Sequence, residues 1–230
     1  MQQLPLGVQL EVSSRFETFR AGDNLAAIEE LCALGKAVSQ PPLWLAGPEG
    51  SGKTHLLQAA CVRLSERGTP VTYLPLRRHG ELAPGLLSGC ELLGAVFLDD
   101  VDAVVGRPAW EGALFTLHNE LHEHGGRLVV ASRQPPSALP WQLADLRSRL
   151  AASSVHVLKP LAEAAQPEAL VARATARGLE LPPETLAYLL RHAPRDFGRL
   201  CRLLDEMDAA SLASQRRLTV PLAKEVLERG

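Results

Sequence analysis

The sequence predicts an α/β fold: a parallel five-stranded sheet core followed by a small all-helical domain. Three observations lead to this prediction. Short apolar segments of strand length alternate with helical patterns as far as residue 161. A strand, a glycine-rich turn and a helix follow one another directly over 43–60. Beyond residue 161 every periodic segment is helical. Strands that alternate with helices need crossover connections, which make the sheet parallel and cover both of its faces.

Each predicted strand is a short apolar run that ends at glycine, proline or charged residues. The five runs are 43–47, 71–76, 95–100, 127–132 and 153–161. Three helices accompany the strands, one before the first strand and two between strands. The first spans 24–38, with Asp23 or Asn24 as its cap. The second follows the glycine-rich turn and ends at Gly68, and the third spans 110–126.

Four further helices are predicted after the sheet, at 163–178, 182–193, 195–215 and 219–229. Residues 1–22 show no regular period. The sequence therefore divides into an N-terminal segment over 1–22, an α/β core over 23–161 and a helical lid over 162–230.

Composition excludes several classes of protein. Hydrophobic residues make up 46% of the 230, enough for a buried core. The net charge of −2 argues against a chain whose main task is gripping a nucleic-acid backbone, so no direct sequence-specific DNA binding is expected. The four cysteines form no CxxC pair, which excludes a zinc ribbon. No leader and no apolar run of spanning length occur, so a cytoplasmic protein without a membrane partner is expected.

The glycine-rich turn, GPEGSGKT, has the spacing of a phosphate-binding P-loop. Its backbone N–H groups and the following helix N-terminus can surround a phosphate. Lys53 would reach the β- and γ-phosphates, and the Thr54 hydroxyl would ligate Mg²⁺. ADP or ATP with Mg²⁺ is therefore the expected cofactor. The predicted nucleotide-binding residues here are Gly47, Pro48, Glu49, Gly50, Ser51, Gly52, Lys53, Thr54 and His55.

Two carboxylates follow the apolar run at 95–98. A carboxylate that ends a buried strand is costly unless it meets a cation, so Asp99 is expected to join Thr54 at the Mg²⁺. Asp100 then occupies the place where related ATPases hold a carboxylate that orients the attacking water.

Four further segments resemble the AAA+ family, and within it the DnaA-like branch. FETFRAGDNLAA is similar to the segment that lines the adenine in that branch. VVASRQPPSAL resembles the sensor 1 strand and loop, which makes Ser132 the candidate polar contact. LADLRSRL resembles box VII, whose last arginine, here Arg149, is the finger offered to a neighbouring subunit's ATP. PRDFGRLCRLL resembles the sensor 2 helix and implies that Arg195 points toward the phosphates.

A narrower resemblance covers nearly the whole chain. QLPLGV, GPEGSGKTHLLQAAC, DLRSRL and SLASQRRLTVPLAKEVL are together similar to the Hda family, DnaA-related proteins of regulatory inactivation. The resemblance implies docking on the DNA polymerase III sliding clamp (its beta subunit) through Gln3, Leu4 and Leu6. It also implies stimulated ATP hydrolysis by the initiator DnaA, which prevents re-initiation of DNA replication. The chain departs from the family at Gly7, where the clamp motif has an apolar residue, and at Asp100, where most AAA+ proteins have glutamate.

A self-contained AAA+ ATPase, acting as a helicase loader or a DnaA-like initiation factor, stays open as the alternative. Lys53, Thr54 and the two aspartates would suffice for such an enzyme. On the preferred hypothesis the chain has at most a weak ATPase of its own and acts on DnaA in trans. The resting nucleotide, homo-oligomer formation and the lid arginine that contacts phosphate are left open.

Overall fold

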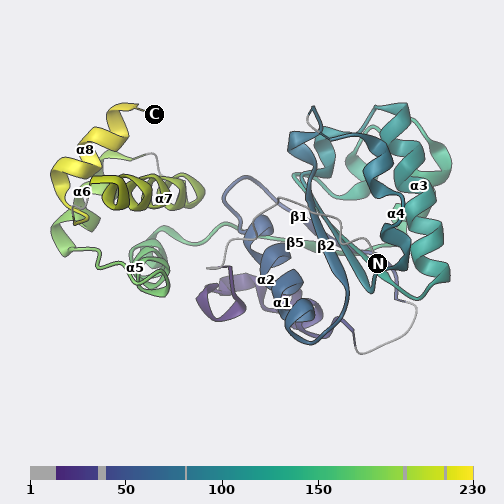
Figure 1. The fold of residues 1–230 in the computed structure, drawn as a ribbon, viewed down its shortest axis with the longest axis horizontal. Helices are drawn as coiled ribbons and strands as arrows, with labels where there is room; N and C mark the ends of the chain where they lie inside the picture. The colour runs from purple at the N-terminus through teal and green to yellow at the C-terminus, as the bar shows by residue number, and fades with distance from the viewer. Residues whose placement is uncertain (1–13, 36–39, 81, 194–195, 215–216, 230) are drawn as a thin grey trace.

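The computed structural model describes residues 14–35, 40–80, 82–193, 196–214 and 217–229. Within these ranges the protein has an α/β sheet domain beside a bundle of helices (Figure 1). The predicted fold class, a parallel five-stranded core with a helical lid, is confirmed.

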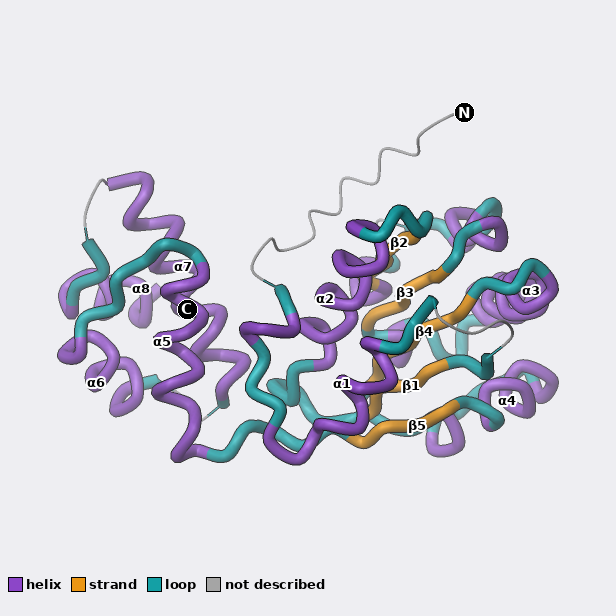
Figure 2. The backbone as a smooth tube through the Cα atoms, turned by 90° about the horizontal axis from the view of Figure 1, so that it is seen from below, coloured by secondary structure: helices purple, strands orange, loops and turns teal. Residues whose placement is uncertain are grey.

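The sheet has the strand order β2-β3-β4-β1-β5, and every neighbouring pair is parallel (Figure 2). Its strands are β1 (Leu43–Ala46), β2 (Val71–Pro75), β3 (Ala95–Asp99), β4 (Arg127–Ser132) and β5 (Ser154–Val157). Because the strands are parallel, their carboxyl ends meet at one edge, where the P-loop follows β1 and Asp99 closes β3.

Helices cover both faces of the sheet, as Figure 2 shows. One face packs against α1 (Leu25–Cys32) and α2 (Lys53–Glu66), and the other against α3 (Pro108–Glu123) and α4 (Ala144–Ala151). Successive strand side chains point to opposite faces, so Leu43 and Leu45 join the first core while Trp44 and Ala46 join the second. Burial on both faces explains the continuous apolar runs of the central strands.

The first helix differs from its prediction. It ends at Cys32 rather than at residue 38, and residues 36–39 lie outside the described part of the chain. Asn24 stands at the cap position, but its side chain makes no cap hydrogen bond. The Asn24 amide instead pairs with the backbone of Lys159, at 3.0 and 2.9 Å, and so ties the N-terminal segment to the end of the sheet. The expected Asx cap is therefore wrong, because a tertiary contact takes both polar atoms.

The last strand and one helix also differ. β5 is a sheet edge and covers only four of the nine predicted residues, with Val157 67% exposed. Helix α4 was not predicted as a helix at all. Short 3-10 helices fill the connections, at Phe16–Thr18, Gly22–Asn24, Leu76–Arg78, Pro84–Leu87, Cys90–Leu92, Val101–Ala103, Pro136–Ala138 and Glu163–Ala165.

The lid contains α5 (Gln166–Ala176), α6 (Pro183–His192), α7 (Phe197–Ser214) and α8 (Val220–Arg229). These helices bury a core of their own, centred on Leu203, Leu204 and Met207, which is separate from the two cores of the sheet. The domain boundaries at residues 22 and 161 stay predictions. Among the described residues, no helix is both long enough and apolar enough to cross a membrane.

Candidate nucleotide site

The P-loop joins β1 to α2 at the carboxyl edge of the sheet. Gly50 and Gly52 have φ angles of 76° and 89°, a left-handed conformation that favours glycine. A Cβ on Gly52 would also lie 2.5 Å from the Phe19 ring, so the N-terminal segment approaches the loop closely here. The pattern of glycines in the motif thus follows from the backbone path and from this contact.

Lys53 is the first residue of α2 and is only 7% exposed. Its Nζ donates hydrogen bonds to the carbonyl oxygens of Gly47 and Pro48, both at 2.7 Å. Burial lowers the pKa of Lys53, and the carboxylates of the 99–102 segment oppose that shift. The ammonium is therefore held inside the loop, where a bound phosphate would compensate the cost of burying it.

Asp99 is the last residue of β3 and is 2% exposed. Its Oδ2 accepts a hydrogen bond from the Tyr73 hydroxyl at 2.8 Å, and its Oδ1 accepts the Asp100 N–H at 3.0 Å. Burial raises the pKa of Asp99, Asp100 raises it further, and the hydrogen bond from Thr54 opposes the rise.

The Thr54–Asp99 pair fits a magnesium site. Hydroxyl and carboxylate oxygens are ligands that Mg²⁺ accepts, with phosphate oxygens and waters completing the octahedron. Across the described ranges no group of three or more His, Cys, Asp or Glu side chains could hold a metal ion. A cation here would therefore need the phosphates of a bound nucleotide.

Asp100 is the one described non-glycine residue with a positive φ, at 53°. A left-handed residue with a side chain is held there at a cost of about 1–2 kcal/mol. Its carboxylate forms two contacts with Arg77, Nε to Oδ2 at 3.0 Å and Nη2 to Oδ1 at 3.2 Å. Arg77 comes from the connection after β2, and no sequence motif pointed to it.

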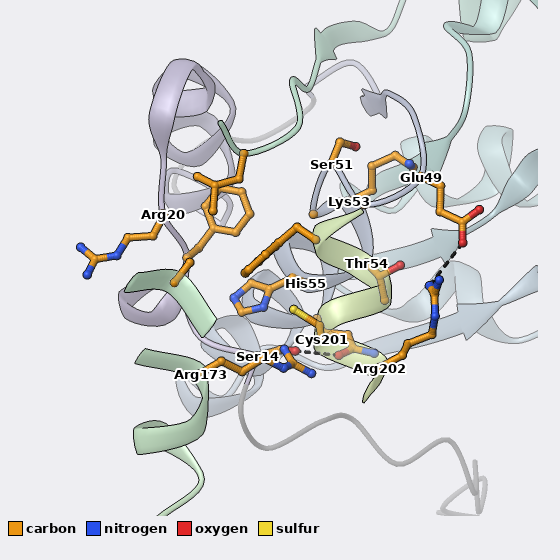
Figure 3. Close-up of a pocket in the computed structure, with 18 of the residues that line it drawn as sticks. Ser14, Arg20, Glu49, Ser51, Lys53, Thr54, His55, Arg173, Cys201 and Arg202 are labelled. Atoms are coloured by element: carbon orange, nitrogen blue, oxygen red, sulfur yellow. Dashed lines mark hydrogen bonds and ion pairs between the residues drawn. The ribbon is translucent and has the colours of Figure 1, made fainter. Parts of the chain in front are cut away.

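The loop from Glu49 to His55, Arg77 and Asp100 border a cavity of about 350 Å³ between the sheet edge, the N-terminal segment and the lid (Figure 3). Asp99 is buried and does not line this cavity. Its described lining carries seven basic side chains and three acidic ones, although the whole chain has a net charge of −2. The basic residues are Arg20, Lys53, Arg77, Arg133, Lys159, Arg173 and Arg202. This local excess of positive charge favours a polyanionic ligand such as a nucleotide.

The N-terminal segment is fastened to α2 beside the cavity. The Ser14 hydroxyl donates to Gln58 Oε1 at 2.9 Å, and the His55 ring contacts the Arg15 carbonyl oxygen at 2.8 Å. Phe19 and His55 lie with their ring centroids 5.5 Å apart. His55, predicted as part of the loop, therefore also anchors the segment expected to line the base.

Lid helix α7 closes the opposite side of the cavity, with Arg202 reaching toward the loop in Figure 3. Its Nη1 lies 3.2 Å from Glu49 Oε1. A Cβ on Gly198 would lie 3.0 Å from Gly50 Cα, so lid and loop are in close contact. Arg195, the predicted lid arginine, lies outside the described residues. Arg173 and Arg202 are the described lid arginines that line the cavity, and the motif comparison had not selected them.

Ser132, the predicted sensor 1 contact, does not line the cavity. It is fully buried, and its hydroxyl accepts from Trp44 Nε1 at 2.8 Å and donates to the Gln134 carbonyl. The next residue, Arg133, reaches the cavity instead and is paired with Asp102.

Arg149 does not line the cavity. It is an exposed residue of α4, on the face of the sheet that packs against α3 and α4. Its guanidinium sits 5.3 Å from the centroid of the Phe115 ring on α3. The predicted clamp residues Gln3, Leu4 and Leu6 lie outside the described part of the chain.

A P-loop at the edge of a parallel β2-β3-β4-β1-β5 sheet, with a helical lid on the same cavity, defines an AAA+ nucleotide-binding fold. Residues 163–227 match the family model of the Hda lid domain. The helical lid of this chain is therefore similar to that of the Hda family, and its overall fold is that of AAA+ proteins.

Solved structures show the same fold. Domain III of the DnaA replication initiation protein from Thermotoga maritima is 23% identical, with 96% of this chain and 98% of that one covered and a TM-score of 0.76. AMPPCP-bound DnaA from Aquifex aeolicus is 24% identical, with 88% and 66% covered and a TM-score of 0.66. The RuvB Holliday junction branch migration motor of Thermotoga maritima is 17% identical, with 95% and 72% covered and a TM-score of 0.62.

Proposed function

We propose that this protein regulates the initiation of DNA replication by stimulating ATP hydrolysis by DnaA while docked on the DNA polymerase sliding clamp. The observation that carries the proposal is an Hda lid domain on a core with the DnaA fold. The regulator binds an adenine nucleotide with Mg²⁺ in the P-loop cavity, and the complex prevents re-initiation.

The cavity supports the nucleotide part of the proposal. Lys53 and the loop amides would hold the phosphates, and Thr54 with Asp99 would hold the Mg²⁺, which would supply charge neutralisation between the β- and γ-phosphates. The similar Aquifex aeolicus DnaA binds AMPPCP, an adenine nucleotide analogue. Phe19 and His55 would border the base from the side of the N-terminal segment.

The position of Arg149 supports action in trans. Its guanidinium is exposed on a face that the chain's own cavity does not share, so it can be offered to a nucleotide on another molecule. A guanidinium beside the transferring phosphoryl group stabilises the charge that develops there. The nucleotide that this guanidinium would contact is the ATP bound to DnaA.

A reconstituted hydrolysis assay tests the proposal. ATP-loaded DnaA is incubated with clamp-loaded DNA, with and without this protein, and phosphate release is followed. We expect release to accelerate only when both the clamp and this protein are present. Equal release with and without the clamp would contradict the clamp-dependent mechanism.

Removing the N-terminal anchors should abolish clamp binding. Docking peptides place most of their binding energy in a few residues, so the double substitution Gln3→Ala, Leu6→Ala should eliminate pulldown of the clamp. ADP binding should be unchanged, because Lys53 and Thr54, which would hold the phosphates and the Mg²⁺, are left intact. Substituting Gln2 alone provides the matched control. If the double variant still pulls down the clamp, residues 1–8 do not form the clamp-binding motif.

A self-contained ATPase is the second candidate, and one observation favours it. Asp100 lines the cavity and is held by Arg77, so a carboxylate that could orient water is already in place. On this alternative the protein would turn over its own ATP, as a helicase loader or DnaA-like factor does.

A further inference from the structure

Glu111 is a buried carboxylate with no basic partner among its recorded contacts. It lies in the first turn of α3 and is 1% exposed. Its two oxygens accept three backbone N–H groups. Gly106 donates to Oε1 at 2.7 Å, Leu143 donates to Oε2 at 2.7 Å, and Gln142 donates to both, at 3.2 and 2.9 Å.

Two of these three donors stand at the beginning of α4. Leu143 occupies the N-cap position, and an apolar side chain cannot accept a hydrogen bond from the first turn. The carboxylate of Glu111, from a different helix, supplies negative charge beside this N-terminus, where the helix dipole favours it. Helix α4 has only eight residues, too few to be stable alone, so its placement depends on such tertiary contacts.

The third donor belongs to the segment that follows the nucleotide-site carboxylates. Gly106 ends the connection from Asp100, and the Gln142 side chain also donates to the Gly106 carbonyl at 3.0 Å. Glu111 thus joins three segments at one point: this connection, α3 and the start of α4. The apolar contacts of Leu146 and Leu150 fix the buried side of α4, and the Glu111 contacts fix its first residues.

We infer that Glu111 is a positioning residue for Arg149, holding α4 so that the arginine projects from the face opposite the cavity. The inference rests on the proposed function, because it concerns the finger that acts on DnaA. Arg149 lies on the last turn of α4. A change in the direction of the helix axis at residue 143 would therefore displace the Arg149 guanidinium. A displacement of about 1 Å at a catalytic group can cost on the order of 100-fold in rate.

Glu111→Gln is the sharpest test, because it keeps the shape of the side chain. Glutamine replaces one accepting oxygen with an NH₂ group, which would face a backbone N–H donor in either orientation. We expect the maximal stimulation of DnaA-bound ATP hydrolysis to fall about 10- to 100-fold. The concentration of this protein that gives half-maximal stimulation, and its affinity for ADP, should stay unchanged.

Two comparisons separate positioning from general destabilisation. Glu123→Gln makes the same chemical change at an exposed position of α3 and should leave stimulation unchanged. In an Arg149→Ala background, Glu111→Gln should cause no further loss, because the guanidinium that Glu111 positions is already absent. An additive loss, or an equal fall in ADP affinity, would overturn the positioning role.

The outcomes also separate this inference from the proposed function. If Arg149→Ala abolishes stimulation and Glu111→Gln spares it, the positioning role of Glu111 is wrong, whereas the proposed role of Arg149 as the finger is upheld. If Arg149→Ala spares stimulation, the finger role and the positioning role are both wrong, although the proposed stimulation of DnaA is upheld. If the unaltered protein does not stimulate hydrolysis, the proposed function itself is wrong. Should Glu111→Gln fail to fold, Glu111→Asp keeps the charge one methylene shorter. It should fold and lose part of the stimulation, and full stimulation by that variant would overturn the inference.

Discussion

Replacing Arg149 with alanine is expected to reduce the stimulated hydrolysis of DnaA-bound ATP by roughly 10³–10⁵-fold, the contribution that arginine fingers make in other NTPases. The transition state spreads negative charge over the transferred phosphoryl group, and the guanidinium is the cation that compensates it. The measurement is phosphate release from ATP-loaded DnaA with clamp, DNA and the variant.

The same substitution should leave the protein itself nearly intact. Arg149 is exposed and its recorded ring contact is with Phe115, so truncation creates no cavity in the core. ADP binding and clamp pulldown should be unchanged, because the cavity lies on another side of the sheet. Arg147→Ala, an exposed arginine on the same helix, is the matched control and should keep stimulation.

Asp100→Asn should have the opposite effect. It removes the carboxylate that Arg77 holds beside the cavity and should weaken any ATP turnover by this chain. Stimulation of DnaA should survive if the ADP-bound protein is the working form. The reverse pair of results, with Asp100→Asn abolishing stimulation and Arg149→Ala sparing it, would favour the self-contained ATPase.

Replacing Lys53 with alanine should weaken ADP binding by about 1.5–3 kcal/mol, or roughly 10- to 160-fold in Kd. Lys53 is 7% exposed, and its ammonium points into the loop, where it contacts the carbonyl oxygens of Gly47 and Pro48. A phosphate would supply the opposite charge that those carbonyls lack. Isothermal titration with ADP and Mg²⁺ measures the change.

Lys159→Ala is the control for this prediction, since it removes the same charge from the rim of the same cavity. Its ammonium pairs with Asp23, and both side chains are 69% exposed, so the loss of affinity should be much smaller. Equal losses of ADP affinity in the two variants would indicate that the overall positive charge of the cavity binds the nucleotide. The specific phosphate contact assigned to Lys53 would then be wrong.

Local pattern alone was sufficient for the parallel sheet, the P-loop and the lid. Continuous apolar runs mark strands that are buried on both faces, as in β1 and β3, and such runs are visible without any knowledge of neighbours. Gly50 and Gly52 have backbone angles that favour glycine. The glycine spacing of the sequence motif therefore indicates the backbone conformation of the loop. The cost of burying a carboxylate at the end of a strand predicted a cation partner for Asp99; its burial is observed, and the cation stays a prediction.

Tertiary structure decided which polar side chains reach the cavity. Ser132 occupies the motif position, yet the Trp44 indole and the Gln134 carbonyl engage its hydroxyl, and Arg133 reaches the cavity in its place. Arg77 belongs to no motif and reaches the cavity from a loop. Arg202 lies in the sensor 2 segment of the lid, but Arg195 and not Arg202 was the arginine predicted there. Helix α4 depends on a carboxylate 32 residues away in sequence, Glu111 to Leu143. Periodicity reports only which face of a segment is buried, whereas these contacts join distant segments and exist only once the chain has folded.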